Sequence, residues 1–226
     1  MIQAIIEQAD DLYANRQRIE NVHASLAILE SSGANEYEIL WRLARARFFL
    51  GQEAPARDSA RSHYHQGVND GEKAVAIAPT RVEGHFWLAV NLGLAAQMQQ
   101  RVPGIGKARR AMRELRQAIQ FDPSYHGAGP LRVLARLQHN LPRLLGGGFG
   151  RARTNYEAAI SLAPENTVTR IYFAELLLES GAQDLAREQL EFVVDVSIDP
   201  GWAFENERDK RIARDMLRKL QTKASL

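Results

Sequence analysis

Residues 152–164 read Ala-Arg-Thr-Asn-Tyr-Glu-Ala-Ala-Ile-Ser-Leu-Ala-Pro, and residues 171–190 read Ile-Tyr-Phe-Ala-Glu-Leu-Leu-Leu-Glu-Ser-Gly-Ala-Gln-Asp-Leu-Ala-Arg-Glu-Gln-Leu. Small residues stand at Ala152, Ala174 and Ala186, and the larger Tyr156 and Leu190 follow two of these alanines on the next helical turn. Ala152 and Ala186 are 34 residues apart. Small residues at this spacing allow two helices to touch, so the stretch predicts a repeated pair of helices.

The pattern extends toward the N-terminus, because a closing Ala-Ile phrase followed by proline recurs. Prolines end the successive helix pairs at positions 79, 123, 164 and 200, at spacings of 44, 41 and 36 residues. A proline after the second helix and a period near 34 residues are typical of the tetratricopeptide repeat. Spacings above that period indicate insertions in the loops, which in repeat arrays often collect on the binding face.

We therefore predict an all-α fold: a tetratricopeptide-repeat array, built as a right-handed superhelix of antiparallel helix pairs and forming a single domain over 1–226. The predicted parts are N-terminal helices in 1–33 that divide near 15–18, repeats at about 34–79, 80–123, 124–164 and 165–200, and a C-terminal capping helix at 203–223.

Three loops have special composition. Residues 53–57 predict a helix start with Pro55 in the first turn, and residues 99–107, which contain Pro103 and two glycines, predict a shaped turn. Gly146 to Gly150 could cradle a phosphate, but neither a Gly-Lys-Ser/Thr sequence nor a parallel-sheet pattern accompanies it. We expect a turn with positive φ there instead.

Composition excludes several functions. The 226 residues are 45% hydrophobic, have a net charge of +2 and contain no cysteine. Disulfides, thiolate chemistry and cysteine-based zinc sites are therefore excluded, and we expect neither nucleic-acid binding nor a transmembrane segment. The N-terminus has no basic start or long apolar core. We expect a cytoplasmic protein as written, or a periplasmic one if an export segment has been removed.

No catalytic motif is recognisable. There is no Gly-x-Ser-x-Gly sequence, no cysteine nucleophile and no carboxylate pair in a loop context. The six histidines include no His-Glu-x-x-His pattern, so no metal site is expected. We predict a protein that is not an enzyme and that needs no cofactor.

The candidate binding residues stand where two predicted repeats open. His85 and His126 each lie at the start of a first helix, one repeat apart, with Trp87 and Asn91 on the helix that His85 opens. A second group, Arg132, Arg136, His139 and Arg143, recurs at spacings of four, three and four residues along one helix. The simplest interpretation of this stripe is a solvated face, and the alternative is an anion site on a concave surface.

Three phrases carry a resemblance to a family: residues 86–93 (Phe-Trp-Leu-Ala-Val-Asn-Leu-Gly), residues 126–136 (His-Gly-Ala-Gly-Pro-Leu-Arg-Val-Leu-Ala-Arg) and residues 141–147 (Leu-Pro-Arg-Leu-Leu-Gly-Gly), followed by Ala152 and residues 156–160. They resemble bacterial tetratricopeptide-repeat proteins related to the T component of TRAP transporters. The resemblance implies a periplasmic or lipid-anchored helical protein that helps a solute-binding protein to deliver organic acids or hydrophobic ligands, in some cases as a ring-shaped homo-oligomer. This chain departs from that pattern because it has no lipobox cysteine and no signal peptide.

Two functional hypotheses follow. The first is a non-enzymatic scaffold whose concave face binds another protein, which the resemblance would make part of a solute transport system. The alternative is a carrier that holds a small organic acid or a hydrophobic ligand in a cavity. That cavity would be walled by Phe86 and Trp87 and guarded by Arg132, Arg136, His85 or His126.

Overall fold

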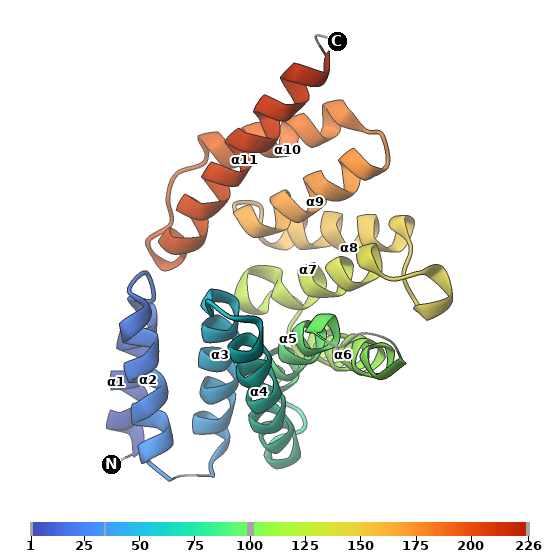
Figure 1. Ribbon diagram of the computed structural model, residues 1–226. Coiled ribbons are helices and arrows are strands. Elements are labelled where there is room, and N and C mark those ends of the chain that lie inside the picture. Colours follow the sequence, from blue (N-terminus) through green and yellow to red (C-terminus); the bar gives the residue numbers. More distant parts are fainter. Residues whose placement is uncertain (1, 34, 99–101, 225–226) are drawn as a thin grey trace. The chain divides into compact units, whose positions relative to one another are not determined.

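The computed structural model describes residues 2–33, 35–98 and 102–224, and these residues form eleven α-helices, two short 3-10 turns and no strand (Figure 1). The predicted all-α helical-repeat fold is confirmed. No helix within these described ranges is long and apolar enough to span a membrane. The helices are α1 (Ile2–Ala14), α2 (Ile19–Ser31), α3 (Tyr37–Glu53), α4 (Arg57–Ile77), α5 (Val82–Met98), α6 (Val102–Phe121), α7 (Tyr125–Asn140), α8 (Phe149–Leu162), α9 (Thr167–Glu179), α10 (Gln183–Asp195) and α11 (Ala203–Ala224), and the 3-10 turns are η1 (Arg143–Leu145) and η2 (Pro200–Trp202).

The chain divides into two compact units, Met1–Tyr125 and His126–Leu226. The boundary follows Pro123, the predicted end of the second repeat. The helix pairs α3/α4, α5/α6, α7/α8 and α9/α10 fall inside the four predicted repeats. The organisation of 1–226 as a single domain stays a prediction.

In the first unit, α3 contacts both α1 and α5, so these three helices lie side by side. Two glycines of α4 let this helix pack closely against α5. A Cβ on Gly67 would lie 2.4 Å from the Asn91 side chain, and a Cβ on Gly71 would lie 2.8 Å from the Leu88 backbone. Trp87, which is 1% exposed, is the largest fully buried side chain of this unit. The small residues of α4 therefore set the distance to α5.

In the second unit, the residues that decided the fold prediction form the core. Ala152, Ala174 and Ala186 are fully buried, as are Tyr156 and Leu190, and all five belong to one hydrophobic cluster. The repeat pattern thus identified the helix–helix contacts correctly. The C-terminal helix α11 packs against α9 and α10 and contributes Ala213 and Leu220 to the same cluster, as expected of a capping helix.

Two loop predictions are wrong. Residues 102–107 belong to the first turns of α6 instead of a loop, because proline and glycine are tolerated before the helical hydrogen-bond ladder begins. Residues 99–101 of the same prediction lie outside the described ranges. Pro55 does not enter a helix, because it lies in a bend between α3 and α4, and α4 starts at Arg57. The predicted positive-φ turn is confirmed at Gly146 (φ 94°) and Gly148 (φ 135°).

Candidate functional site

His85, one of the predicted binding residues, is buried at the start of α5 and already has two partners. Its Nδ1 lies 2.8 Å from Glu114 of α6, and its Nε2 lies 2.9 Å from the carbonyl of Pro79. Burial alone would lower the pKa of His85, but the bonds to Glu114 and to the Pro79 carbonyl outweigh it and raise the pKa above its usual value. The geometry suits an imidazolium that joins α5 to α6.

Trp87 and Asn91 lie one turn apart on α5 and face the interior of the same unit. The indole of Trp87 donates to the hydroxyl of Tyr125 at 3.0 Å. The amide of Asn91 donates to the carbonyls of Ala44 in α3 and Trp87 in α5, at 3.0 and 2.8 Å. Asn91 thereby bridges two helices, and its fully buried side chain rests against Gly67.

His126 opens the second unit in an unusual backbone conformation. His126, Gly127 and Ala128 have φ values of 53°, 60° and 57°, so three consecutive residues are left-handed before the regular part of α7. Such φ values cost residues with a Cβ about 1–2 kcal/mol each. The ring of His126 contacts that of Trp202 in a tilted arrangement, with 4.7 Å between centroids. We call residues 126–128 the left-handed turn.

Arg132 stabilises the left-handed turn. Its Nη1 donates to the Gly127 carbonyl at 2.7 Å and to Asn166 Oδ1 at 3.3 Å, and its Nη2 lies 3.4 Å from the His126 carbonyl. Burial lowers the pKa of Arg132 to about 10, so the guanidinium remains charged at neutral pH. Two residues of the Gly-Pro-x-Arg phrase at 129–132 are thus explained: Pro130 starts the regular helix, and Arg132 bonds back to the turn, whose own glycine is Gly127.

The expected solvated stripe of Arg132, Arg136, His139 and Arg143 is wrong for two of its members. Arg132 and His139 are buried, at 5% and 8% exposure, because both reach partners on other elements of the second unit. His139 Nε2 lies 2.9 Å from Glu179, and Arg136 forms an ion pair with Glu175, both of α9. Arg143, in η1, is exposed. These side chains therefore mainly tie α7 to α9.

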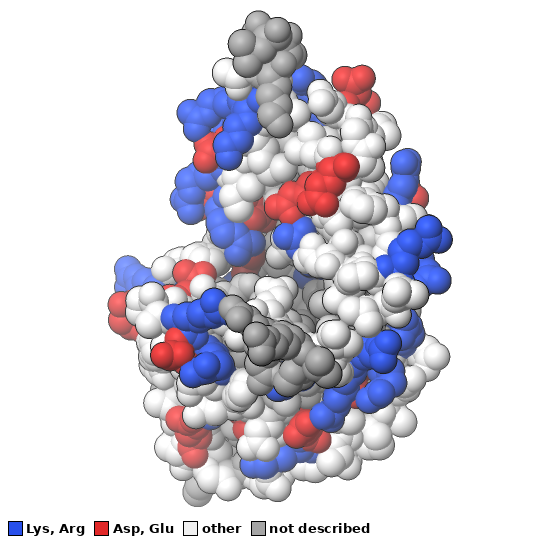
Figure 2. Space-filling view, turned by 45° about the vertical axis from the view of Figure 1, so that its right-hand side comes forward, with Lys and Arg blue, Asp and Glu red and all other residues white. Residues whose placement is uncertain are grey.

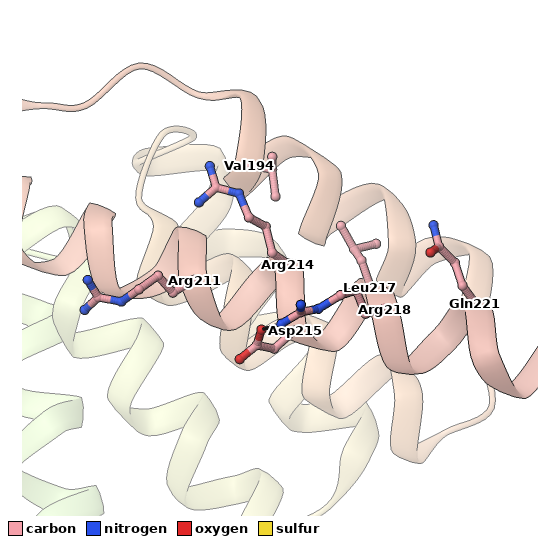
Figure 3. Close-up of a pocket in the computed structure, with 7 residues that line it drawn as sticks. All are labelled: Val194, Arg211, Arg214, Asp215, Leu217, Arg218 and Gln221. Atoms are coloured by element: carbon pink, nitrogen blue, oxygen red, sulfur yellow. Dashed lines mark hydrogen bonds and ion pairs between the residues drawn. The ribbon is translucent and has the colours of Figure 1, made fainter.

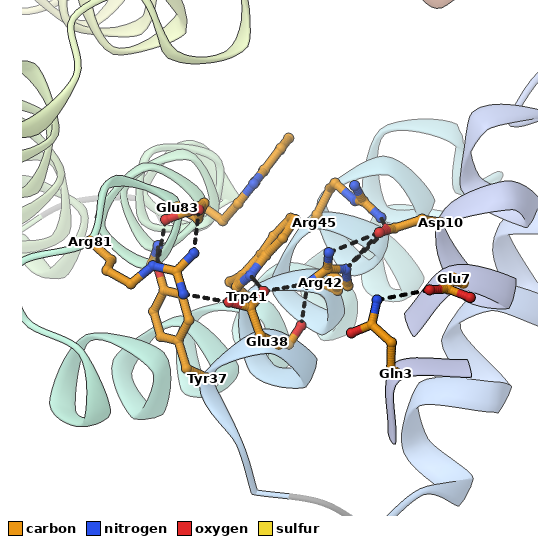
Figure 4. A network of polar contacts seen from close by, with 12 residues as sticks. Gln3, Glu7, Asp10, Tyr37, Glu38, Trp41, Arg42, Arg45, Arg81 and Glu83 are labelled. Carbon is orange, nitrogen blue, oxygen red and sulfur yellow. Dashed lines mark hydrogen bonds and ion pairs between the residues drawn. The ribbon is translucent and has the colours of Figure 1, made fainter. Parts of the chain in front are cut away.

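The structure also assembles a polar and aromatic cluster that was not predicted (Figure 4). It consists of Asp10 on α1, of Tyr37, Glu38, Trp41, Arg42 and Arg45 on α3, and of Arg81 and Glu83 at the start of α5; we call it the α1–α3–α5 network. The pairs that join its helices connect residues more than 30 positions apart, so helical spacing alone could not reveal them. The available signal was two arginines one turn apart beside a tryptophan.

Asp10 and Glu38 organise this network. Asp10 accepts from Arg42 at 2.8 Å and from Arg45 at 2.6 Å, while Glu38 accepts from Trp41 at 2.9 Å and from Arg42 at 2.7 Å. Burial alone would raise the pKa of Asp10, but the hydrogen bond from Arg42 and the charge of Arg45 outweigh it, so that pKa lies below its usual value. Burial would also raise the pKa of Glu38, but the hydrogen bonds from Trp41 and Arg42 outweigh it and lower that pKa. Both carboxylates are therefore charged at neutral pH.

The aromatic rings of the network are stacked against guanidinium groups. Arg42 lies 4.0 Å from the centroid of Trp41, and Arg45 lies 3.9 Å from that of Tyr13, a neighbour of the network on α1. At the other end, Arg81 lies 4.3 Å over Tyr37 and forms ion pairs with Glu38 and Glu83. These contacts hold tryptophan, tyrosine and arginine side chains rigidly on adjacent helices.

A shallow groove lies in the second unit between the end of α10 and the middle of α11 (Figure 3). Its lining is basic with an apolar floor: Val194, Arg211, Arg214, Asp215, Leu217, Arg218 and Gln221. Within the described part of the chain, no group of three or more His, Cys, Asp or Glu side chains is placed to hold a metal ion.

The stacked helix pairs define the class: a helical-repeat protein with a fold of the tetratricopeptide type. The fold is shared with a thermophilic TPR protein of Thermus thermophilus, at a TM-score of 0.70 and 21% identity over 97% of this chain and 98% of that chain. MamA superposes with a TM-score of 0.51 at 16% identity, over 92% of this chain and 93% of that chain.

The sequence comparisons assign the chain to a family more narrowly than the fold does. The family model described as "Regulator of microtubule dynamics protein 1-3" matches residues 5–129, which is more than half of the chain, and the chain belongs to this family. Regulator of microtubule dynamics protein 2 from Bos taurus is 30% identical over 123 residues, and the protein of the same name from Mus musculus is 25% identical over 122 residues. The match covers 54% of this chain and only 30% of each relative's length.

These matches do not support the resemblance to the T component of TRAP transporters. The family region coincides closely with the first unit, Met1–Tyr125, which contains the α1–α3–α5 network. The phrases at 126–136 and 141–147 that carried most of that resemblance lie largely or wholly outside it. They are explained by the left-handed turn and by the turn at Gly146 and Gly148.

Proposed function

We propose that the chain is a non-enzymatic protein-interaction module and that the α1–α3–α5 network is its docking surface for a protein partner. The observation that carries this proposal is the position of the network, which lies inside the family region of residues 5–129. Helical-repeat folds present adjacent first helices as a binding surface. Tryptophan, tyrosine and arginine are also the residue types that contribute most to the energy of protein interfaces.

The accessible side chains of the network are charged, and they include both carboxylates and an arginine. The side chains of Asp10, Glu38 and Arg81 are 35%, 36% and 45% exposed, whereas Arg42 and Arg45 are only 11% and 14% exposed. A partner would meet a rigid frame in which the less accessible arginines fix the half-buried carboxylates. Preorganisation of this kind reduces the entropy lost on binding.

We further propose that the partner is a component of microtubules or of the machinery that controls their growth, because the curated relatives are named for that role. The test is co-sedimentation of the purified chain with polymerised tubulin, together with a turbidity assay of tubulin assembly. We expect the wild-type chain to co-sediment and to change the assembly rate. A chain that does neither would show that the partner is not the microtubule itself.

A matched pair of variants tests the docking surface. Arg81→Ala removes an exposed arginine of the network, and Arg61→Ala removes an exposed arginine that pairs with Asp58 on the surface of α4. We expect Arg81→Ala to weaken binding by about tenfold, as for loss of an interface arginine worth about 1.4 kcal/mol, and Arg61→Ala to leave it unchanged. Equal effects of the two would place the docking surface elsewhere.

The carrier alternative has less support. His85, Trp87 and Asn91 are occupied by protein partners, and Arg132 is engaged by backbone carbonyls of its own unit. No observation among the described residues favours a ligand for this set. Their predicted role as binding residues therefore stays a prediction, as does a place for this chain beside a solute-binding protein.

A further inference from the structure

The lining of the groove between α10 and α11 contains more arginines than carboxylates that could pair with them. Three of its lining residues are arginines and one is an aspartate. Arg218 forms an ion pair with Asp215, whereas Arg211 and Arg214 have no ion-pair partner among the described residues. In Figure 3 the Arg214 side chain extends toward Val194 on α10, and the Arg211 side chain, which is exposed, points away from Val194. Figure 2 shows Lys and Arg side chains gathered around the C-terminal part of the second unit, with fewer Asp and Glu among them.

The usual structural reasons for such arginines do not apply. Cations in the last turn of a helix interact favourably with the helix dipole, but this effect falls off within one turn. Arg211 and Arg214 lie at least ten residues before α11 ends at Ala224. Arg211 has Asp215 one turn away, yet Asp215 pairs with Arg218 instead.

The floor of the groove is apolar. Val194 and Leu217 are only partly buried and pack against the hydrophobic core cluster of the second unit. The groove has a volume of about 560 Å³ and is open along one side. Pockets that hold small molecules are usually enclosed and bury most of the ligand, so an open groove of this kind suits a segment of chain better.

We propose that this groove binds an acidic peptide segment of a partner protein, with carboxylates on Arg211 and Arg214 and an apolar side chain on Val194 and Leu217. The chemistry is complementary, because a guanidinium binds a carboxylate through two parallel hydrogen bonds. The groove is a second docking surface. It lies outside residues 5–129 and does not depend on the function proposed for the α1–α3–α5 network.

The test measures binding of the full chain to a short fluorescein-labelled peptide that is rich in Glu with interspersed Leu. Binding is detected by fluorescence anisotropy at low salt. A matched peptide carries Gln in place of every Glu. The Glu peptide is expected to bind and the Gln peptide to bind much more weakly. Equal binding of the two, or binding of neither, would overturn the proposal.

The double variant Arg211→Ala/Arg214→Ala should weaken binding of the Glu peptide by about tenfold, or about threefold for each exposed charge pair. The control is Arg109→Ala/Arg113→Ala, which removes two exposed arginines of α6 that also have no ion-pair partner among the described residues. Because all four side chains are at the surface, both variants should retain the wild-type circular dichroism spectrum. An equal loss in the control would show general charge attraction and would refute a specific groove.

Anionic lipid is the competing occupant, and it has its own measurement. Vesicles of phosphatidylcholine with phosphatidylserine are floated with the wild-type chain and with the Arg211→Ala/Arg214→Ala variant. If the proposal is right, binding of the Glu peptide depends on these two arginines, whereas flotation of the chain with the vesicles does not. Flotation that is lost in the variant, with no binding of the Glu peptide, would assign the groove to a membrane surface instead.

Discussion

Gly127→Ala should destabilise the second unit, because Gly127 is the central residue of the left-handed turn. Its φ is 60°, and a Cβ built on it would lie 2.8 Å from the Asn166 amide and 3.4 Å from Trp202. The Asn166 side chain would have to move. That side chain caps α9 by accepting from the backbone N–H of Thr169 at 3.0 Å.

The cost follows from these two effects. A Cβ in the left-handed region costs about 1–2 kcal/mol, and disturbing an asparagine cap costs about 1 kcal/mol. The expected loss of unfolding free energy is therefore about 2–3 kcal/mol. At about 4–8 °C per kcal/mol for a unit of this size, the melting temperature of the second unit should fall by about 10–20 °C.

The assay is urea and thermal unfolding, monitored by far-ultraviolet circular dichroism and by tryptophan fluorescence, since the ring of Trp202 contacts that of His126 in the turn. Gly150→Ala is the control. Gly150 lies in the first turn of α8 with nothing within 4 Å of its Cβ position, so alanine there should stabilise by about 0.5–1 kcal/mol. A Gly127→Ala chain as stable as the wild type would refute the strain assigned to the turn.

Two further predictions concern the first unit. Because the pKa of His85 is raised in the folded state, its bond to Glu114 contributes fully to stability at pH values below 6.5, the ordinary histidine pKa. This contribution is lost as pH rises through the folded-state pKa. The bond to His85, and secondarily its charge, holds the pKa of Glu114 below its ordinary 4.5, a contribution that is lost as pH falls. Melting temperature measured against pH should therefore show a gain between about 4.5 and 6.5 that Glu114→Gln abolishes; a variant with the wild-type profile would contradict the assignment. Gly71→Ala should cost about 1–3 kcal/mol because its Cβ would meet the Leu88 backbone, whereas Gly106→Ala, with nothing within 4 Å, should be neutral or stabilising in the same unfolding assay.

The helix pairs could be predicted from sequence because their signal is local. Ala152, Ala174 and Ala186 mark helix–helix contacts, and all three are fully buried. The start of α6 was missed for a local reason as well. Proline and glycine are read as loop residues, but the first turn of a helix accepts both, since its N–H groups have no partner within the helix.

The candidate site was harder to predict because its contacts are long-range. Helical spacing placed Arg132 on a polar stripe, but its partners include Asn166, 34 positions away. The ion pair between Arg42 and Asp10 likewise joins residues 32 positions apart on α3 and α1. Spacing along one helix indicates which residues share a face. It does not indicate whether a neighbouring helix supplies a carboxylate or a carbonyl to that face.

The two proposed surfaces differ in how much of their charge is already paired, and this difference should allow them to be told apart. In the α1–α3–α5 network, Arg42 and Arg81 are both paired with carboxylates of the chain itself. A partner there gains from fixed geometry more than from net charge, so its affinity should depend weakly on salt. In the groove, Arg211 and Arg214 are unpaired among the described residues. Exposed charges of this kind are screened at physiological ionic strength, so a partner whose binding falls steeply with salt is bound at the groove.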